Sequence, residues 1–211
     1  MALIVDTEFL ERENRQLATR LKGAQLRQNA VLEDLDTKAS RCLDRALLAS
    51  LSTCVWIKKN HNLLMTGPTG VGKTWLSCAL AYSACRQGIT SVYYRLPALL
   101  QDLELARNDG RYKKIMRTIV KSQLLVLDDL SGTAPSAEQL RDLLEIIDER
   151  YQKGSTVITS QLPIASWHAA LGDPTMADAI LDRVVHNAYR FELDGDSLRK
   201  LRTTIDATET M

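Results

Sequence analysis

The sequence predicts an α/β protein in which a mainly parallel, five-stranded sheet lies between helices. Three observations predict this fold: short apolar runs alternate with helical segments, a glycine-rich turn follows one run, and two carboxylates end another. Alternation of buried strands with helices is typical of a parallel sheet covered on both faces. The 211 residues are enough for one such core and a small appendage.

Two helices are predicted ahead of the sheet. From Thr7 to about Leu35, apolar residues recur roughly at helical spacing among arginines and glutamates, and Leu43 to Trp56 has a similar pattern. A boundary between them, at 36–40, divides the chain into an N-terminal helical segment (1–40) and an α/β domain (41–211).

Five strands then alternate with helices. The strands are expected in the apolar runs at 62–67, 91–95, 124–130, 155–160 and 189–193. The helices between them are expected at 73–86, 97–108, 111–121 and 136–152. The last helix is the most regular, with one apolar stripe for the core: Leu140, Leu143, Leu144, Ile147 and Tyr151.

Composition excludes several classes of protein. The formal net charge is +1, so any nucleic-acid surface must be a local patch. The four cysteines lack both CxxC spacing and the density of a disulfide scaffold, which favours a reduced, cytoplasmic location. There is no run of about 18 apolar residues, and Asp6 comes too early for a signal peptide, so we expect no membrane partner.

A phosphate-binding loop is predicted between the first strand and the helix at 73–86. Gly67, Gly72, Lys73 and Thr74 have the spacing GxxxxGKT in the strand-to-helix context that this motif requires. Glycines allow positive φ and close backbone approach, so successive N–H groups can surround a polyphosphate. Lys73 would reach the β- and γ-phosphates, and the Thr74 hydroxyl would bind Mg²⁺. The alternative is a glycine-rich turn without a ligand. The nucleotide would be held by Gly67, Pro68, Thr69, Gly70, Val71, Gly72, Lys73, Thr74 and Trp75.

Two carboxylates, Asp128 and Asp129, end the apolar run that begins at Leu124. Parallel sheets bind their ligands at the carboxyl ends of the strands. Asp128 would hold Mg²⁺ through its water shell, and Asp129 would orient or deprotonate the attacking water. The expected cofactors are therefore ATP and Mg²⁺. The alternative is an ordinary strand end whose acidic residues face solvent.

A polar group follows the strand at 155–160. Gln161 is placed to contact the γ-phosphate or its water, and we assign it to the catalytic set. The sequence does not separate Gln161 from Thr159 and Ser160 as the sensor, and for each of them a hydrogen-bonded turn is an equal alternative.

The motifs also exclude other nucleotide enzymes. The Asn-Lys-x-Asp tetrad with which GTPases bind guanine is absent, and so is the LSGGQ motif of ABC transporters ahead of the acidic strand. Small kinases need an acceptor pocket and a basic lid, for which the sequence has no signal. Arg183, near the end of a helical segment, has the position of an arginine finger for a neighbour's γ-phosphate. The alternative is a surface pair with Asp182.

Longer motifs make a family resemblance specific. The chain resembles the IstB family of transposition helper ATPases, which are relatives of the DnaC helicase loaders in the AAA+ class, from about Phe9 to Lys200. The motifs are GPTGVGKTWL, ACRQG, LARNDGRYKK, LLVLDDL, RDLLEIIDERY, VITSQLP and ADAILDRVVHNAYR.

The resemblance implies an AAA+ P-loop NTPase core without a separate C-terminal lid domain. It implies an ATP-hydrolysing homo-oligomer, a ring or spiral, that binds duplex DNA and helps a partner transposase choose its target. Such a protein would be cytoplasmic and nucleoid-associated when bound to DNA. Arg183 would be the finger that acts in trans, and Arg199 could partly replace the missing second sensor.

Two features depart from the family pattern. The chain starts partway through the N-terminal helical region of longer members, so we expect a shortened member or a trimmed start. Asp129 stands where many AAA+ proteins have glutamate, and its shorter reach predicts slow hydrolysis.

A basic helix face is the predicted contact to DNA. Cations crowd the segment 107–121, whereas Tyr112, Ile115, Met116 and Ile119 fall on the opposite helical face. Such contacts position a phosphate backbone and carry no sequence information. The alternative is a solvated helix face. A second basic series, Arg12 to Arg27, could hold DNA, a partner or a second subunit. The predicted DNA-binding residues are Arg107, Arg111, Lys113, Lys114 and Arg117.

The sequence therefore predicts an ATP-dependent regulator of transposition. Two other classes stay open: a DnaC-like helicase loader that acts on single-stranded DNA, and a binding module in which ATP clamps an assembly without being hydrolysed.

Overall fold

The computed structural model describes residues 2–35, 44–130, 134–195 and 197. In this part of the chain, five strands form one sheet in the order β2-β3-β4-β1-β5, and every neighbouring pair is parallel. All five strands therefore end at the same edge of the sheet. Their bounds are β1 Asn62–Thr66, β2 Ser91–Arg95, β3 Leu124–Asp128, β4 Ser155–Ser160 and β5 Ala188–Glu192.

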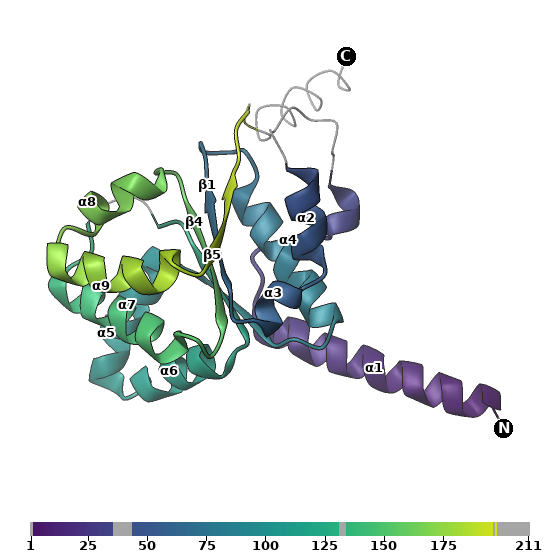
Figure 1. Cartoon of the computed structure of the whole chain (residues 1–211). Helices are drawn as coiled ribbons and strands as arrows, with labels where there is room; N and C mark the ends of the chain where they lie inside the picture. Colours follow the sequence, from purple (N-terminus) through teal and green to yellow (C-terminus); the bar gives the residue numbers. More distant parts are fainter. Residues whose placement is uncertain (1, 36–43, 131–133, 196, 198–211) are drawn as a thin grey trace, which may run out of the picture.

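Helices cover both faces of the sheet (Figure 1). One layer contains α1 (Ala2–Ala24), α2 (Arg45–Ser52), α3 (Val55–Lys58) and α4 (Lys73–Arg86). The other contains α5 (Leu96–Asp109), α6 (Tyr112–Lys121), α7 (Ala137–Arg150), α8 (Trp167–Leu171) and α9 (Pro174–Val185). Short 3₁₀ turns lie at Leu32–Asp34 and Ile164–Ser166. In Figure 1 the N-terminal half of α1 projects away from the rest of the molecule.

The strands are apolar throughout because both of their faces are buried. In β1, Leu63 and Met65 pack toward α4, whereas Leu64 packs toward α5 and α7. Each such leucine stabilises the fold by about 1.5–3 kcal/mol relative to an exposed one. Near-continuous apolar runs are typical of parallel sheets for this reason.

The predicted fold class and all five strands are confirmed. The helices predicted between the strands agree with α4, α5, α6 and α7 to within two residues at each end. The start of α7 has a chemical cause: the Ser136 hydroxyl accepts from the Gln139 N–H, and the Gln139 side chain accepts from the Ser136 N–H. This capping box satisfies two backbone donors that would otherwise lack partners.

Three details of the predicted elements were wrong. The first helix ends at Ala24 rather than near Leu35, because Gln25 adopts a left-handed conformation (φ 50°) and the chain turns back toward α4. The second predicted helix is divided by Cys54, which is also left-handed (φ 56°). Tyr151 lies just past the end of α7 and is 41% exposed, so it does not continue the apolar stripe.

Some predictions fall outside the described residues, namely the boundary at 36–40 and the role of Arg199. The division into 1–40 and 41–211 therefore stays a prediction. Among the described residues, no helix is both long and apolar enough to cross a membrane.

Candidate active site

The phosphate loop leaves β1 at the edge where the strands end. Gly67, Gly70 and Gly72 all have positive φ (144°, 90° and 101°), a region that other residues rarely adopt. A Cβ at Gly67 would overlap the carbonyl oxygen of Leu193, and one at Gly70 would overlap the Ser197 hydroxyl. The glycines are thus required by conformation and by the close approach of the chain that follows β5.

Lys73 begins α4 and points back into this loop. Its Nζ donates to the carbonyl oxygens of Gly67 (2.6 Å) and Pro68 (2.8 Å), and the side chain is buried. Burial lowers the pKa of Lys73, an effect that the nearby carboxylates oppose. An ammonium held against backbone carbonyls beside a helix N-terminus is suited to binding phosphate oxygens.

Thr74, one residue further along α4, contacts the carboxylate of Asp128. Its hydroxyl lies 3.0 Å from both Oδ1 and Oδ2 of Asp128. Asp128 is only 2% exposed, and it also accepts from the hydroxyls of Tyr93 (2.7 Å) and Thr159 (2.6 Å). Together with Thr74, these hydroxyls fix the position of the Asp128 carboxylate.

Strand order explains why Thr159 takes part. β4 lies between β1, which leads to the phosphate loop, and β3, which ends at Asp128. The Thr159 hydroxyl donates to Asp128 and accepts from the N–H of Asp129 (3.0 Å). It therefore fixes the positions of both acidic residues.

The three polar residues at the end of β4 have different surroundings. Ser160 is buried, and its hydroxyl bonds to the carbonyl of Leu130 and the N–H of Leu162. Gln161 lies at the phosphate loop, where its Oε1 accepts from the Thr69 hydroxyl at 2.5 Å. The γ-phosphate contact predicted for Gln161 stays a prediction, but its side chain is at the site.

Asp129 adopts a left-handed backbone conformation with φ 75°. Strain of this kind costs about 1–3 kcal/mol in a non-glycine residue and is concentrated at functional sites. The carboxylate is held by Arg95, whose Nη2 and Nε lie 2.9 and 3.2 Å from Oδ2. The predicted base is therefore ion-paired in this structure.

Sequence reasoning missed three residues of this site: Tyr93, Arg95 and Arg27. Tyr93 and Arg95 belong to β2, which pairs with β3 so that Arg95 lies opposite Asp128. Polar groups in the last residues of a predicted parallel strand were a usable signal. Arg27 comes from the segment after α1, and its Nη1 lies 3.8 Å from Oδ2 of Asp128. The sequence placed Arg27 in the second basic series and gave no signal that it lies at this site.

The residues present fit Mg²⁺. Thr74 and Asp128 bring oxygen atoms together, and Mg²⁺ is typically bound by one or two protein oxygens together with phosphates and water. Among the described residues, no group of three or more His, Cys, Asp or Glu side chains could hold a metal ion by itself. The donor set therefore suits a metal that arrives with a nucleotide.

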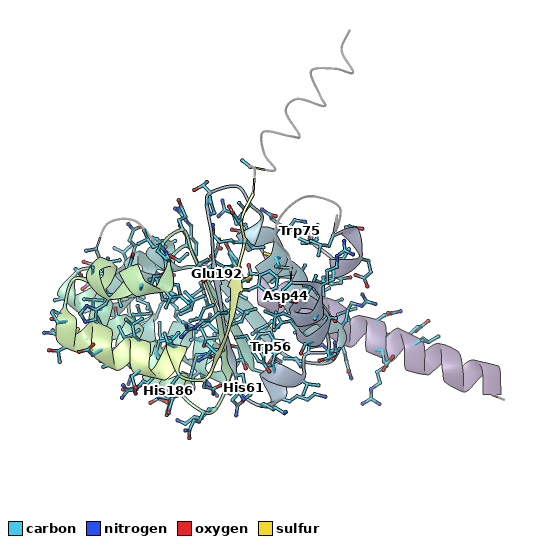
Figure 2. All side chains as sticks on the ribbon, turned by 45° about the horizontal axis from the view of Figure 1, so that its top comes forward. Asp44, Trp56, His61, Trp75, His186 and Glu192 are labelled. Carbon is cyan, nitrogen blue, oxygen red and sulfur yellow. The ribbon has the colours of Figure 1, made fainter. Side chains whose placement is uncertain are left out.

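Arg183 lies at the opposite edge of the sheet, where the strands begin. The Nδ2 of Asn62, the first residue of β1, is 3.4 Å from the carbonyl oxygen of Arg183 and 3.2 Å from that of Val184. Figure 2 shows His186, close to Arg183 in sequence, and His61 at one end of the molecule, away from Trp75 and Glu192. A cavity at the Arg183 end is only about 10 Å³, too small for a nucleotide.

Arg183 is also ion-paired. Its Nε contacts Oδ1 of Asp148 on α7, and its Nη1 donates to the carbonyl of Ala179 at 2.7 Å. The partner is thus Asp148 rather than Asp182, the residue named in the surface-pair alternative.

The predicted DNA-binding residues divide into two groups. Arg107 contacts Asp142 and Glu138 and lies over the ring of Tyr112, and Arg111 pairs with Asp109 and Asp102. Another group lies exposed on α6 and forms no ion pair among the described residues: Lys113, Lys114 and Arg117.

Comparison with known proteins agrees with this geometry. The model of the family described as "IstB-like ATP binding protein" matches residues 1–206. The insertion sequence ATP-binding protein y4pL of Sinorhizobium fredii is 51% identical over 201 residues, which cover 95% of this chain and 82% of that protein. The insertion sequence IS1162 ATP-binding protein of Pseudomonas fluorescens is 43% identical over 175 residues, or 82% of this chain and 76% of that protein.

A solved structure extends the comparison to the fold. The crystal structure of DnaI superposes with a TM-score of 0.69 at 25% sequence identity, and the match covers 78% of this chain and 91% of that chain. The fold is therefore that of an AAA+ P-loop protein, as the motifs predict. With a family match that spans nearly its whole length, the chain belongs to the IstB-like ATP-binding proteins.

Proposed function

We propose that this protein is an ATP-hydrolysing regulator of transposition that assembles on duplex DNA and acts on a partner transposase. The observation that supports hydrolysis most directly is the convergence of Lys73, Thr74, Asp128 and Asp129 at one edge of the sheet. The insertion sequences named for its relatives support the link to transposition.

Each residue of the site has a distinct role in this proposal. The loop from Gly67 to Gly72 and the amine of Lys73 bind the polyphosphate of ATP. Thr74 and Asp128 would hold Mg²⁺, which would neutralise charge on the phosphates of ATP. Asp129 accepts a proton from the attacking water once its carboxylate has left Arg95, and Gln161 orients that water.

The position of Arg183 supports a role in trans. Five strand residues at about 3.3 Å each separate the start of β1, which contacts Arg183, from the phosphate loop. A single arginine side chain cannot cover that distance. In an oligomer, one subunit's strand-start edge can face the next subunit's phosphate loop, which would bring Arg183 to the neighbour's ATP. ATP would then stabilise the assembly, and hydrolysis would loosen it.

The exposed cations of α6 support binding to DNA through phosphates. Repeated in each subunit of a ring or spiral, Lys113, Lys114 and Arg117 would form a basic track without base recognition. Sequence preference would then have to come from the transposase or from DNA shape.

The test is ATP turnover by the purified protein alone, with duplex DNA and with single-stranded DNA, while light scattering follows the size of the assembly. We expect duplex DNA to stimulate turnover and growth of the assembly. The second candidate function is a helicase loader, because the motifs resemble those of the DnaC loaders and a solved DnaC helicase loader has a similar fold. A preference for single-stranded DNA would support the loader, and assembly without turnover would support an ATP-clamped binding module.

A further inference from the structure

The segment that follows α1 is anchored along α4. Near the end of α1, Arg20 donates from Nε to the carbonyl of Cys85 at 2.9 Å. Ala24 and Ala30 are buried, Ala30 as part of the core beside α4, and Glu33 forms an ion pair with Arg86 at the end of α4. These contacts hold both ends of the segment 25–30 on the same helix that begins at the phosphate loop.

The middle of this segment is held next to the second turn of α4. The thiol of Cys78 lies against the backbone N–H groups of Arg27 and Gln28. Cys78 is one helical turn from Thr74, and its side chain is buried. The backbone of Arg27 is therefore fixed beside the nucleotide site, and its side chain reaches the end of β3.

Arg27 acts on Asp128 directly and through Tyr93. Its Nη1 lies 3.8 Å from Oδ2 of Asp128, and its guanidinium hydrogen-bonds to the Tyr93 hydroxyl. Arginine only donates, so the Tyr93 oxygen accepts from Arg27 and the single Tyr93 proton is directed to Asp128, 2.7 Å away. The pKa of Arg27 is raised, first by the hydrogen bond to Tyr93 and also by the charge of Asp128.

The two partners of this ion pair differ in their freedom to move. Asp128 is 2% exposed and is held by three hydroxyls, whereas the Arg27 side chain is 50% exposed. A guanidinium so close to Asp128 repels a divalent cation at the same carboxylate. When both cations compete for Asp128, Arg27 is the one that can turn into solvent.

We propose that Arg27 is a placeholder cation, which neutralises Asp128 in the nucleotide-free protein and is displaced when Mg²⁺ and ATP bind. The inference rests on the proposed function, because it needs ATP and Mg²⁺ at this site. Displacement of Arg27 removes one anchor of the segment 25–30. Nucleotide binding would thereby loosen the attachment of α1 to the rest of its own subunit.

The first test is the Mg²⁺ requirement for binding a fluorescent, non-hydrolysable ATP analogue. Arg27→Met should lower the half-saturating Mg²⁺ concentration about five- to tenfold, the effect expected from removing one nearby positive charge. Arg27→Lys should stay close to wild type. Arg20→Met is the matched control, because it removes the contact to Cys85 without touching the site, and it should leave the Mg²⁺ requirement unchanged.

The second test is hydrogen exchange of the amides at 26–30. In the wild-type protein, adding Mg²⁺ and the analogue should make the amides at 26–30 exchange faster. In Arg27→Met, these amides should already exchange at the faster rate before nucleotide is added. An unchanged or increased Mg²⁺ requirement in Arg27→Met would overturn the inference. So would an equal shift in Arg20→Met, which would show a general loss of anchoring. If wild-type protein bound no analogue at any Mg²⁺ concentration, the proposed function would fail together with the inference.

Discussion

The hydroxyl of Thr74 lies 3.0 Å from both carboxylate oxygens of Asp128, although the two residues are 54 positions apart in the chain. Thr74 lies in the first turn of α4, the helix that follows β1, and Asp128 ends β3, which is two positions from β1 in the sheet. Their contact places the phosphate loop and the acidic strand in a single site. It also provides the most direct way to test that site.

Replacing Thr74 with valine removes this hydroxyl at nearly constant shape. We expect ATP turnover to fall by about 10²–10³, because a metal bound at this point supplies several kcal/mol of stabilisation to the transition state. Thr74→Ser keeps the hydroxyl and should keep most of the activity. The measurement is phosphate release at several Mg²⁺ concentrations, and equal losses in the two variants would contradict a role for the hydroxyl.

Arg95 restrains the predicted base. Arg95→Ala should increase basal turnover about two- to fivefold, because an exposed ion pair contributes up to about 1 kcal/mol and its loss removes this restraint on Asp129. Asp129→Asn should abolish turnover while ATP binding persists. Arg190, an exposed arginine on β5, offers a control for the loss of a positive charge. A decrease in Arg95→Ala would mean that Arg95 positions Asp129 for catalysis instead.

Arg183 and Lys73 should complement each other between subunits. Lys73→Ala and Arg183→Ala proteins are each expected to be inactive, since one lacks a phosphate contact and the other lacks the finger. A mixture should recover part of the turnover, because some interfaces combine an intact loop with an intact finger. Arg141→Ala, an exposed change on α7, serves as a control. No recovery in the mixture would count against action in trans.

The exposed cations of α6 predict binding to DNA that depends on salt concentration but not on base sequence. Alanine at Lys113, Lys114 and Arg117 should weaken binding to all duplexes alike and reduce the salt slope by about 0.9 log units per lost phosphate contact. Lys153, paired with Glu149 on another surface, is a control for the loss of charge. Unchanged binding of fluorescent duplexes across a salt series would refute this assignment.

We expect Arg107 to contribute to the stability of the fold rather than to DNA binding. It pairs with Asp142, which is 0% exposed and whose Oδ2 has no hydrogen-bond partner among the described residues. Arg107→Ala should therefore lower the free energy of unfolding by about 1–3 kcal/mol, since a buried carboxylate loses its charged partner and keeps only the hydroxyl of Tyr112 among the described residues. Thermal denaturation measures this loss. The double variant with Asp142→Asn should recover part of it, and no recovery would argue against the pair as the cause.

Local sequence patterns were sufficient to predict those parts of the protein whose structure depends on residues close together in the chain. The phosphate loop, the strands and the helices between them follow from glycine conformation, apolar runs and helical spacing, which act over a few residues. Asp128 and Asp129 were singled out because they end an apolar run, and Arg183 because it lies near the end of a helical segment; the roles assigned to all three stay predictions.

The other residues of the site could be placed only from the strand order and from the return of the chain along α4. Parallel pairing of β2 with β3 brings Tyr93 and Arg95 to the acidic residues, and β4 inserts Thr159 between the phosphate loop and Asp128. The left-handed turn at Gln25 allows Arg27 to reach Asp128. Such contacts depend on which nonlocal segments pack together, and hydrophobic spacing within one segment contains no information about its neighbours in space.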